Sequence, residues 1–242
     1  MSSGFLDFHS HILPDMDDGA VYPDESIQLL LAEKRAGVSD VCLTPHYYAE
    51  DESVSSFLTR RQRSYAALRE AKNHSRRSFP ALHLGAEVHY FEGMAEEPLL
   101  ELLCCGASRL LLVEPPMSRW SDLFYNELSS IRQKRDLQPV IAHLDRYIAF
   151  FDEPQLLRKM RERGCWIQFN AGSFLSGSHT KLMFDFFQSG EVYFLGSDCH
   201  NLTDRPCNMR ALVSAFKKEK LVDRYLSFSR SGIALIKGKR RI

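Results

Sequence analysis

Seven short apolar runs alternate with segments of helical pattern along this chain, and that alternation limits the folds open to it. The runs cover residues 5–12, 38–44, 82–89, 109–114, 139–143, 165–170 and 192–196. Strands that alternate with helices usually pair in parallel through crossover connections. The runs are nearly continuous in apolar residues, as strands buried on both faces are. The pattern therefore predicts an α/β fold of the barrel type.

Helices are expected between the runs, where apolar residues recur at helical spacing. The first helix would begin at Asp24 and end near Gly37. The others would cover residues 55–77, 93–103, 121–135, 153–163, 180–188 and 208–220. The 242 residues are 44% hydrophobic, enough for one large core, and no repeat or linker interrupts them. We expect a single domain over 1–242.

Composition excludes several classes of function. Lys plus Arg equals Asp plus Glu at 31 each, so no global attraction to nucleic acid or to an anionic bilayer is expected. No run has the length of a membrane helix, and the first residues lack the pattern of a secretory signal. The six cysteines form no Cys-x-x-Cys pair. A reduced, cytoplasmic protein without stable membrane insertion is expected.

Imidazoles and carboxylates gather where the apolar runs end. His9 and His11 lie two apart in the first run, so both would face the barrel interior, as would Asp7. The complete set is His9, His11, Asp18, His46, Glu87, Glu114, His143, Asp198 and His200. For the pair His9 and His11, metal binding is slightly favoured over a hydrogen-bonded core pair, whereas His46, Glu87, Glu114 and His143 are each better explained alone as satisfied core or cap residues. Together they share the carboxyl end of the strands, where barrel enzymes place their chemistry.

Nine such residues exceed what one ion needs, and they suit two or three ions that share bridging carboxylates. Four carboxylates in one pocket would repel one another unless cations neutralised them. The mixture of nitrogen and oxygen ligands favours Mn, Fe, Zn or Mg. His89 lies two residues past Glu87, which leaves a supporting role open.

A multinuclear centre of this kind favours hydrolysis of a phosphate ester. Arg146 and Arg205 lie close in sequence to His143 and His200, and a guanidinium can bind phosphate oxygens with two bonds. A solvated surface charge is the alternative for either arginine. Five aromatic residues follow the ligand-bearing runs and could line a cleft: Tyr47, Tyr48, Trp120, Tyr125 and Tyr147. Phe124 is expected in the core.

Residues 199–205 match Cys-x5-Arg, the pattern of cysteine-dependent phosphatases. Such a loop binds phosphate through backbone N–H groups and lowers the pKa of its thiol. Here the segment has no glycine, and Asp198 and Asp204 place negative charge where an anion would bind. We expect Cys199 to point away from the ligands and to take no part in catalysis.

These motifs resemble the polymerase and histidinol phosphatase (PHP) superfamily, and within it the metal-dependent protein-tyrosine phosphatases of bacterial capsule and exopolysaccharide clusters. The resemblance rests on the stretch 7–19 with its Asp-Asp-Gly, Thr-Pro-His at 44–46, Gly-Ala-Glu-Val at 85–88, Val-Glu at 113–114, Ile-Ala-His-Leu-Asp-Arg-Tyr at 141–147, and Ser-Asp-Cys-His-Asn-Leu at 197–202 with Arg205. Tyr47 and Tyr48 depart from the basic residues that many relatives carry there.

The resemblance implies a distorted seven-stranded (β/α) barrel of PHP type with a trinuclear, usually manganese, centre held by the nine residues. It also implies that Arg146 and Arg205 bind phosphate. From the chemistry of such a site, Asp18 is a candidate to orient the attacking water. The implied substrate is phosphotyrosine on the tail of a membrane-bound bacterial tyrosine kinase that controls polysaccharide synthesis and export.

Three hypotheses about the function stay open from the sequence. The leading one is a protein-tyrosine phosphatase. The second is a phosphoesterase on the same barrel that acts on a small metabolite, such as histidinol phosphate, or on nucleic acid. The third is a scaffold without catalysis, which the complete ligand set disfavours. The sequence leaves a homo-oligomer open, and the short basic tail 237–241 is read as solvated charge.

Overall fold

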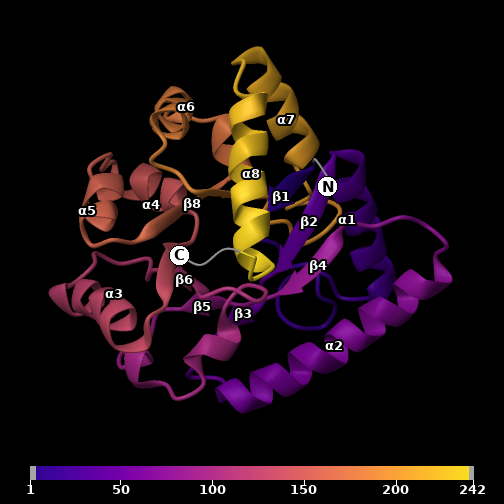
Figure 1. The fold of residues 1–242 in the computed structure, drawn as a ribbon, viewed down its shortest axis with the longest axis horizontal. Helices are drawn as coiled ribbons and strands as arrows, with labels where there is room; N and C mark the ends of the chain where they lie inside the picture. Colours follow the sequence, from indigo (N-terminus) through magenta and orange to yellow (C-terminus); the bar gives the residue numbers. More distant parts are fainter. Residues whose placement is uncertain (1–3, 240–242) are drawn as a thin grey trace.

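The computed structural model describes residues 4–239 and has parallel strands surrounded by helices (Figure 1). Residues 1–3 and the end of the basic tail, 240–242, lie outside the described residues. The strands are β1 (Phe5–Asp7), β2 (Val38–Leu43), β3 (His46–Tyr47), β4 (Ala81–Leu84), β5 (Glu87–His89), β6 (Leu110–Glu114), β7 (Gln138–Ile141), β8 (Trp166–Asn170) and β9 (Phe194–Gly196).

The strands form two sheets in which every pairing is parallel, as the alternation predicted. One sheet has the order β1-β2-β4 and the other β3-β5-β6-β7-β8-β9. Hydrogen bonds also join β1 to the far edge of the second sheet: Phe8 N–H donates to Leu195 at 3.1 Å, and Asp198 N–H donates to His9 at 2.8 Å. The parallel strands are therefore strongly curled, and the first and last of them lie side by side.

The described residues contain nine strands rather than the seven expected. The expected strand 82–89 is interrupted at Gly85-Ala86, where β4 ends and β5 begins. A Cβ at Gly85 would lie 3.0 Å from Cys105 Sγ and 3.3 Å from Thr44 Cγ2, so the backbone approaches its neighbours closely here. Pro45 likewise separates β2 from β3, because proline donates no hydrogen bond to a sheet.

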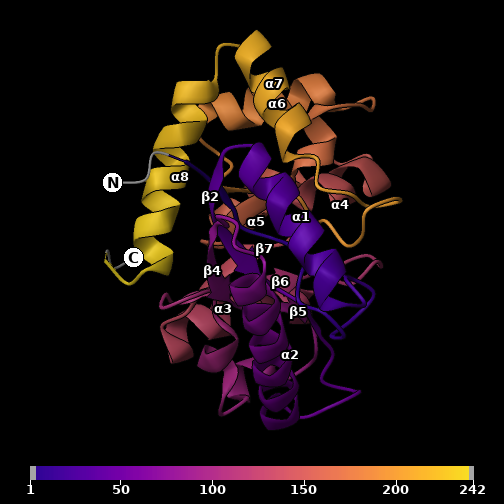
Figure 2. The same cartoon turned by 90° about the vertical axis from the view of Figure 1, so that its right-hand side faces the viewer.

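Helices cover the strands on several sides. They are α1 (Pro23–Arg35), α2 (Val54–His74), α3 (Asp122–Arg135), α4 (Leu144–Phe151), α5 (Leu156–Glu162), α6 (Thr180–Ser189), α7 (Met209–Lys218) and α8 (Val222–Ile236). In Figure 1, α3 to α6 lie on one side of the strands and α1 and α2 on the other, while α8 crosses in front. Figure 2 shows α8 on the outer edge, away from α1 and α2.

The core consists of the apolar runs and the inner faces of these helices. Phe57, Phe124, Phe174 and Phe216 are fully or almost fully buried, which confirms that Phe124 belongs to the core. Close packing of aromatic rings of this kind contributes both buried area and ring–ring contacts. The rigid core fixes the strand ends from which the polar side chains project.

Two helices were not predicted and one was predicted wrongly. The α8 helix packs on β1, where Tyr225 O–H donates to the Leu6 carbonyl at 3.0 Å. The α4 helix begins directly after His143. Residues 93–103, expected as one helix, instead form two 3₁₀ turns, η1 (Met94–Glu96) and η2 (Leu100–Leu103), with Pro98 between them. No helix among the described residues is long and apolar enough to cross a membrane.

Candidate metal centre

The nine predicted ligands converge at the carboxyl ends of the strands. His9 and His11 follow β1, His46 begins β3, Glu87 begins β5, and Glu114 ends β6. The remaining four are His143 after β7, Asp198 and His200 after β9, and Asp18 in the loop between β1 and α1. Seven elements of the fold thus supply one site, as the sequence analysis expected.

Three overlapping groups of ligand atoms lie in this site, each with its atoms within 4.8 Å of one another. The groups are His9, His11, Glu87 and Asp198; His11, Asp18, His46 and His200; and His46, Glu87 and Glu114. His143 adjoins them, with Nε2 at 2.7 Å from Glu87 Oε1 and 3.5 Å from Glu114 Oε1. All nine predicted residues are brought together. Their role as metal ligands stays a prediction.

Backbone geometry at the site is unusual for non-glycine residues. His143 has φ 31° and Asp198 has φ 52°, both in the left-handed region. Such conformations cost free energy and persist where the surrounding structure holds them for a function. Both residues lie directly after a strand, so the sharp turn aims their side chains into the site.

Three imidazoles are oriented by hydrogen bonds from Nδ1. His9 donates to Gln168 Oε1 at 3.2 Å, His11 to Asp17 Oδ2 at 2.7 Å, and His200 to the Asp198 carbonyl at 2.9 Å. Each bond leaves Nε2 as a lone pair directed at the carboxylates. This is the arrangement in which proteins present histidine to a metal ion.

Several buried polar atoms at the centre have no hydrogen-bond partner among the described residues. They are His46 Nδ1, Glu87 Oε2, His143 Nδ1, Asp198 Oδ1 and His200 Nε2. An unpartnered buried polar atom costs free energy, and more so when it is charged. Divalent cations would satisfy four of these atoms at once, so the residues present fit a metal centre. His143 Nδ1 is the exception, because this ring turns Nε2 toward Glu87.

The pKa shifts at the site also favour bound cations. Burial by itself would raise the pKa of Glu87 and of Asp198, but the charge of His9, with that of the other histidines, holds both well below the usual range. Burial and the charge of His11 lower the pKa of His200 to about 4. His9 and His11 show the opposite effect, because nearby carboxylates raise their pKa against burial. Without cations the site needs protons on these imidazoles, and cations would displace them.

Both predicted arginines reach the site. Arg146 Nη2 and Arg205 Nη2 each donate to Asp198 Oδ2 at 2.9 Å, and Arg205 Nη1 lies 3.4 Å from Asp18 Oδ2. Each arginine side chain is 38% exposed, so the guanidinium groups face the opening of the site. The alternative of a free surface charge is wrong for both.

Sequence reasoning missed three residues that support the ligands. Asp17 Oδ2 accepts from His11 Nδ1 and, at 2.8 Å, from the His46 N–H, while Gln168 Oε1 accepts from the His143 N–H at 2.6 Å. Asn170 Nδ2 donates to Asp198 Oδ2 at 2.7 Å. Asp17 is adjacent to Asp18 in the Asp-Asp-Gly stretch, which was the available signal. His89, for which a supporting role was left open, does lie 3.2 Å from Glu114 Oε2.

Asp7 does not point the same way as His9 and His11, and the expectation that the three side chains share one face was wrong. β1 ends at Asp7, so the alternation of a strand does not continue from Asp7 to His9. The Asp7 carboxylate accepts from the Ser197 N–H at 2.8 Å and lies in a separate buried group with Glu33 and Cys199. Cys199 thus points away from the site, as expected, and burial raises the pKa of its thiol well above the usual value.

The prediction of a cleft lined by aromatic residues is only partly confirmed. Tyr48 stacks on His46 with ring centroids 5.3 Å apart and lies at the site. Tyr47 and Tyr147 are instead buried in the core, at 2% and 0% exposure. The reason for Tyr147 is the α4 helix, which turns this residue inward so that its hydroxyl donates to the Pro115 carbonyl.

Comparison with known proteins decides the family. A family model described as "Capsular polysaccharide synthesis, CpsB/CapC" matches residues 5–227, a span that contains every residue of the site. This chain belongs to the CpsB/CapC family. The match confirms the resemblance found from the sequence motifs.

CpsB/CapC relatives cover most of the chain. The chain is 28% identical over 244 residues to the putative tyrosine-protein phosphatase CapC of Staphylococcus aureus, covering 97% of this chain and 92% of CapC. It is 30% identical over 230 residues to the tyrosine-protein phosphatase YwqE of Bacillus subtilis strain 168, covering 88% of this chain and 84% of YwqE.

Solved structures confirm the CpsB/CapC fold. A chain from the crystal structures of YwqE of Bacillus subtilis and CpsB of Streptococcus pneumoniae, described as unique metal-dependent tyrosine phosphatases, superposes with a TM-score of 0.78. The two are 22% identical, and 98% of this chain and 96% of that chain are covered. The phosphotriesterase homology protein of Escherichia coli, 9% identical, superposes with a TM-score of 0.55 over 94% of this chain and 96% of that chain. A mixed α/β fold with a curled parallel sheet is therefore established.

Proposed function

We propose that this chain is a metal-dependent phosphatase that hydrolyses phosphotyrosine on protein substrates. The observation that carries the proposal is the site itself: eight imidazoles and carboxylates in overlapping groups of ligand atoms, with His143 beside Glu87 and two arginines directed at Asp198. The named activity of the CpsB/CapC relatives supports it.

The metal centre would hold two or three divalent ions, with manganese favoured over iron, zinc or magnesium. Three overlapping groups of ligand atoms fit more than one ion, and Glu87 belongs to two of them. When bound, such ions polarise a phosphoryl oxygen and lower the pKa of water at the site. The side chains that would hold the ions lie mostly inside the protein, and Asp18 is the only exposed residue among the nine.

Arg146 and Arg205 would bind the phosphate oxygens that the ions do not reach. Their guanidinium groups now share Asp198 Oδ2, and a phosphate dianion at the opening would compete for both. Asp18 lies 3.2 Å from His200 Nε2 at the rim, where it can accept a proton from water and orient it. Cys199 would not become phosphorylated, because its thiol is buried outside the site, and we propose that water attacks phosphorus without a phospho-enzyme.

The remaining features of the proposal concern fold and context. We count the strands as a distorted seven-stranded barrel of PHP type in a single domain over 1–242, with β3 continuing β2 and β5 continuing β4. The natural substrate would be the tyrosine-rich tail of a membrane-bound bacterial tyrosine kinase, and the chain would act on it in the cytoplasm. The capsular description of the family supports this context.

Substrate comparison tests the function. Manganese-loaded protein is offered phosphotyrosine peptides, histidinol phosphate and single-stranded DNA at equal concentrations. We expect the highest kcat/KM for the peptides. A clear preference for histidinol phosphate or for DNA would assign the site to the second class of phosphoesterase instead.

A further inference from the structure

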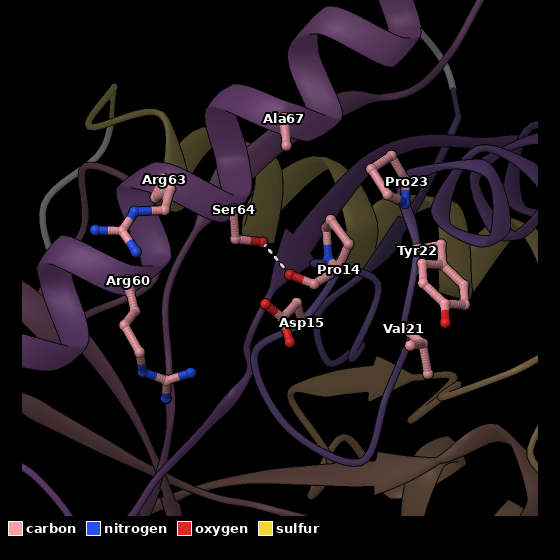
Figure 3. A pocket seen from close by; sticks show the side chains of 9 residues that line it. All are labelled: Pro14, Asp15, Val21, Tyr22, Pro23, Arg60, Arg63, Ser64 and Ala67. Carbon is pink, nitrogen blue, oxygen red and sulfur yellow. Dashed lines mark hydrogen bonds between the residues drawn. The ribbon is translucent and has the colours of Figure 1, made fainter.

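A second cavity lies beside the metal centre, between α2 and the loop that carries the ligand Asp18. It has a volume of about 790 Å³ and is lined by nine residues, all labelled in Figure 3. Arg60, Arg63, Ser64 and Ala67 project from α2, and residues 14–15 and 21–23 form the facing wall. We call this cavity the side cleft.

The facing wall of the side cleft is apolar and unusually exposed. Val21 and Tyr22 are 54% and 70% exposed, so this wall leaves two large apolar side chains open to solvent. Pro14, Pro23 and Ala67 extend the apolar lining. An exposed apolar wall next to polar groups is typical of a surface that contacts a partner molecule.

The charges of the side cleft leave one cation free. The charge of Arg60 is already paired, because its guanidinium donates to both carboxylate oxygens of Glu52 and to the Met16 carbonyl. Arg63 is exposed and makes no ion pair with any residue among 4–239. Asp15, on the facing wall, is exposed and also makes no ion pair with any residue among 4–239, so the cleft holds one unpaired carboxylate as well. A ligand of the cleft would therefore meet the exposed side chains of Val21 and Tyr22, the unpaired guanidinium of Arg63 and the unpaired carboxylate of Asp15.

Hydrogen bonds between the two walls fix the shape of the cleft. Ser64 Oγ donates to the Pro14 carbonyl at 2.5 Å, as drawn in Figure 3, and Arg60 Nη1 donates to the Met16 carbonyl at 3.1 Å. A preformed cleft loses little entropy when a flexible peptide binds.

The side cleft adjoins a smaller cavity at the metal centre, and the two cavities share Arg60 as a lining residue. The smaller cavity has a volume of about 270 Å³ and is also lined by Asp17, Asp18, His46 and Tyr48. Asp15 in the side cleft is three residues from Asp18, which places their Cα atoms at most about 11 Å apart. An extended peptide rises about 3.3 Å per residue, so three or four residues span this distance.

We propose that the side cleft binds the segment of a phosphoprotein substrate that flanks the scissile phosphotyrosine. It takes an aromatic or aliphatic side chain against Val21 and Tyr22 and an acidic side chain at Arg63, three or four residues from the phosphotyrosine. This inference rests on the proposed function. Because Arg63 lies outside the reacting site, it acts on binding and not on the chemical step.

Charge reversal at Arg63 tests the inference. Arg63→Glu is compared with Arg69→Glu, a matched control at an exposed arginine of α2 that lies outside the cleft. Three substrates are used with manganese-loaded protein: a phosphotyrosine peptide with an aromatic–acidic pair at the proposed spacing, the same peptide with lysine in place of the acid, and para-nitrophenyl phosphate, which has no flanking segment.

For the acidic peptide, Arg63→Glu should raise KM about tenfold with kcat nearly unchanged, since exposed charge pairs have modest strength. The lysine peptide should become the better peptide substrate of this variant. Arg69→Glu should stay within about twofold of the wild type, and para-nitrophenyl phosphate should be hydrolysed equally by all three proteins.

The inference would be overturned if Arg63→Glu and Arg69→Glu raised the KM for the acidic peptide equally. It would also be overturned if Arg63→Glu lost as much activity on para-nitrophenyl phosphate as on the acidic peptide. Failure of the proposed function is distinguishable, because the wild type itself would then hydrolyse no phosphotyrosine peptide.

Discussion

The Nε2 atoms of His9 and His11 lie 3.1 Å apart at the centre of the site. Each ring donates its Nδ1–H elsewhere, to Gln168 or to Asp17, so both Nε2 lone pairs face the same space. Glu87 Oε2 lies 3.0 Å from one of them and 3.2 Å from the other. Lone pairs and a carboxylate at such distances repel unless positive charge lies among them. A shared divalent cation satisfies the three groups together.

Asp17→Asn should weaken the metal centre without removing a ligand. Asp17 accepts from His11 Nδ1 and from the His46 backbone N–H, and it thereby fixes the ring of His11 and the backbone that carries His46. Loss of such a supporting carboxylate typically costs 10–100-fold in metal affinity or activity. The measurement is turnover of para-nitrophenyl phosphate during a manganese titration. Asp185→Asn, an exposed site on α6, serves as the control and should match the wild type. Unchanged manganese dependence in Asp17→Asn would remove Asp17 from this role.

Arg146→Lys and Arg205→Lys should each lower kcat/KM by about 10²–10³-fold, because lysine keeps the charge but loses the planar fork that binds phosphate. The double variant should lose less than the product of the two single losses, since both groups meet at Asp198 Oδ2. Steady-state kinetics on a phosphotyrosine peptide provide the check. Arg158→Lys, on the exposed face of α5, is the control. Losses below about threefold in both single variants would contradict the assigned role.

Cys199→Ser should retain activity within about threefold. The thiol is fully buried, and burial with the nearby charges of Glu33 and Asp7 raises its pKa well above the usual value, so no thiolate is available to attack phosphorus. Turnover of the purified, manganese-loaded variant gives the answer. A fall to background, with the fold intact by circular dichroism, would make Cys199 the nucleophile after all.

Asp40 should link stability to acid pH. Burial alone would raise the pKa of this carboxyl, but hydrogen bonds from His83, Lys237 and Ser39 lower it to about 2. A carboxyl with a lowered pKa in the folded state stabilises the protein above pH 4, and this contribution is lost as the pH falls toward 2. Asp40→Asn should therefore reduce the free energy of unfolding by about 2 kcal/mol at pH 7.

Urea unfolding at several pH values measures this effect. The difference between the wild type and Asp40→Asn should narrow below pH 4. Asp136→Asn, whose carboxylate is 96% exposed, should differ from the wild type by under about 0.5 kcal/mol. A difference for Asp40→Asn that is the same at pH 3 and pH 7 would show that charge is not the cause.

Much of the fold was predictable because strands buried on both faces leave a strong apolar signal. The α8 helix was missed, since its serines and Gly232 dilute that signal and its stability comes from packing on β1. The split of the strand at Gly85 was also missed, because it depends on a close approach to Cys105 and Thr44 that only the tertiary structure creates.

The convergence of these nine side chains was predictable because most of them lie at or just after the end of an apolar run, a position that sequence alone locates. Asp17 and Gln168 were not, since their roles depend on which ring nitrogen they contact across the chain. Tyr147 was misplaced for a related reason: the turn at His143, with φ 31°, starts a helix that rotates the ring into the core.

The central claim is that these side chains hold several cations that the reaction requires. Elemental analysis of the purified chain, paired with phosphotyrosine-peptide turnover before and after chelation, tests it most directly. We expect two or three divalent ions per chain, turnover that disappears with their removal, and recovery on addition of manganese in proportion to the ions regained. Full turnover by the chelated protein, or reloading with manganese without any turnover, would contradict the claim.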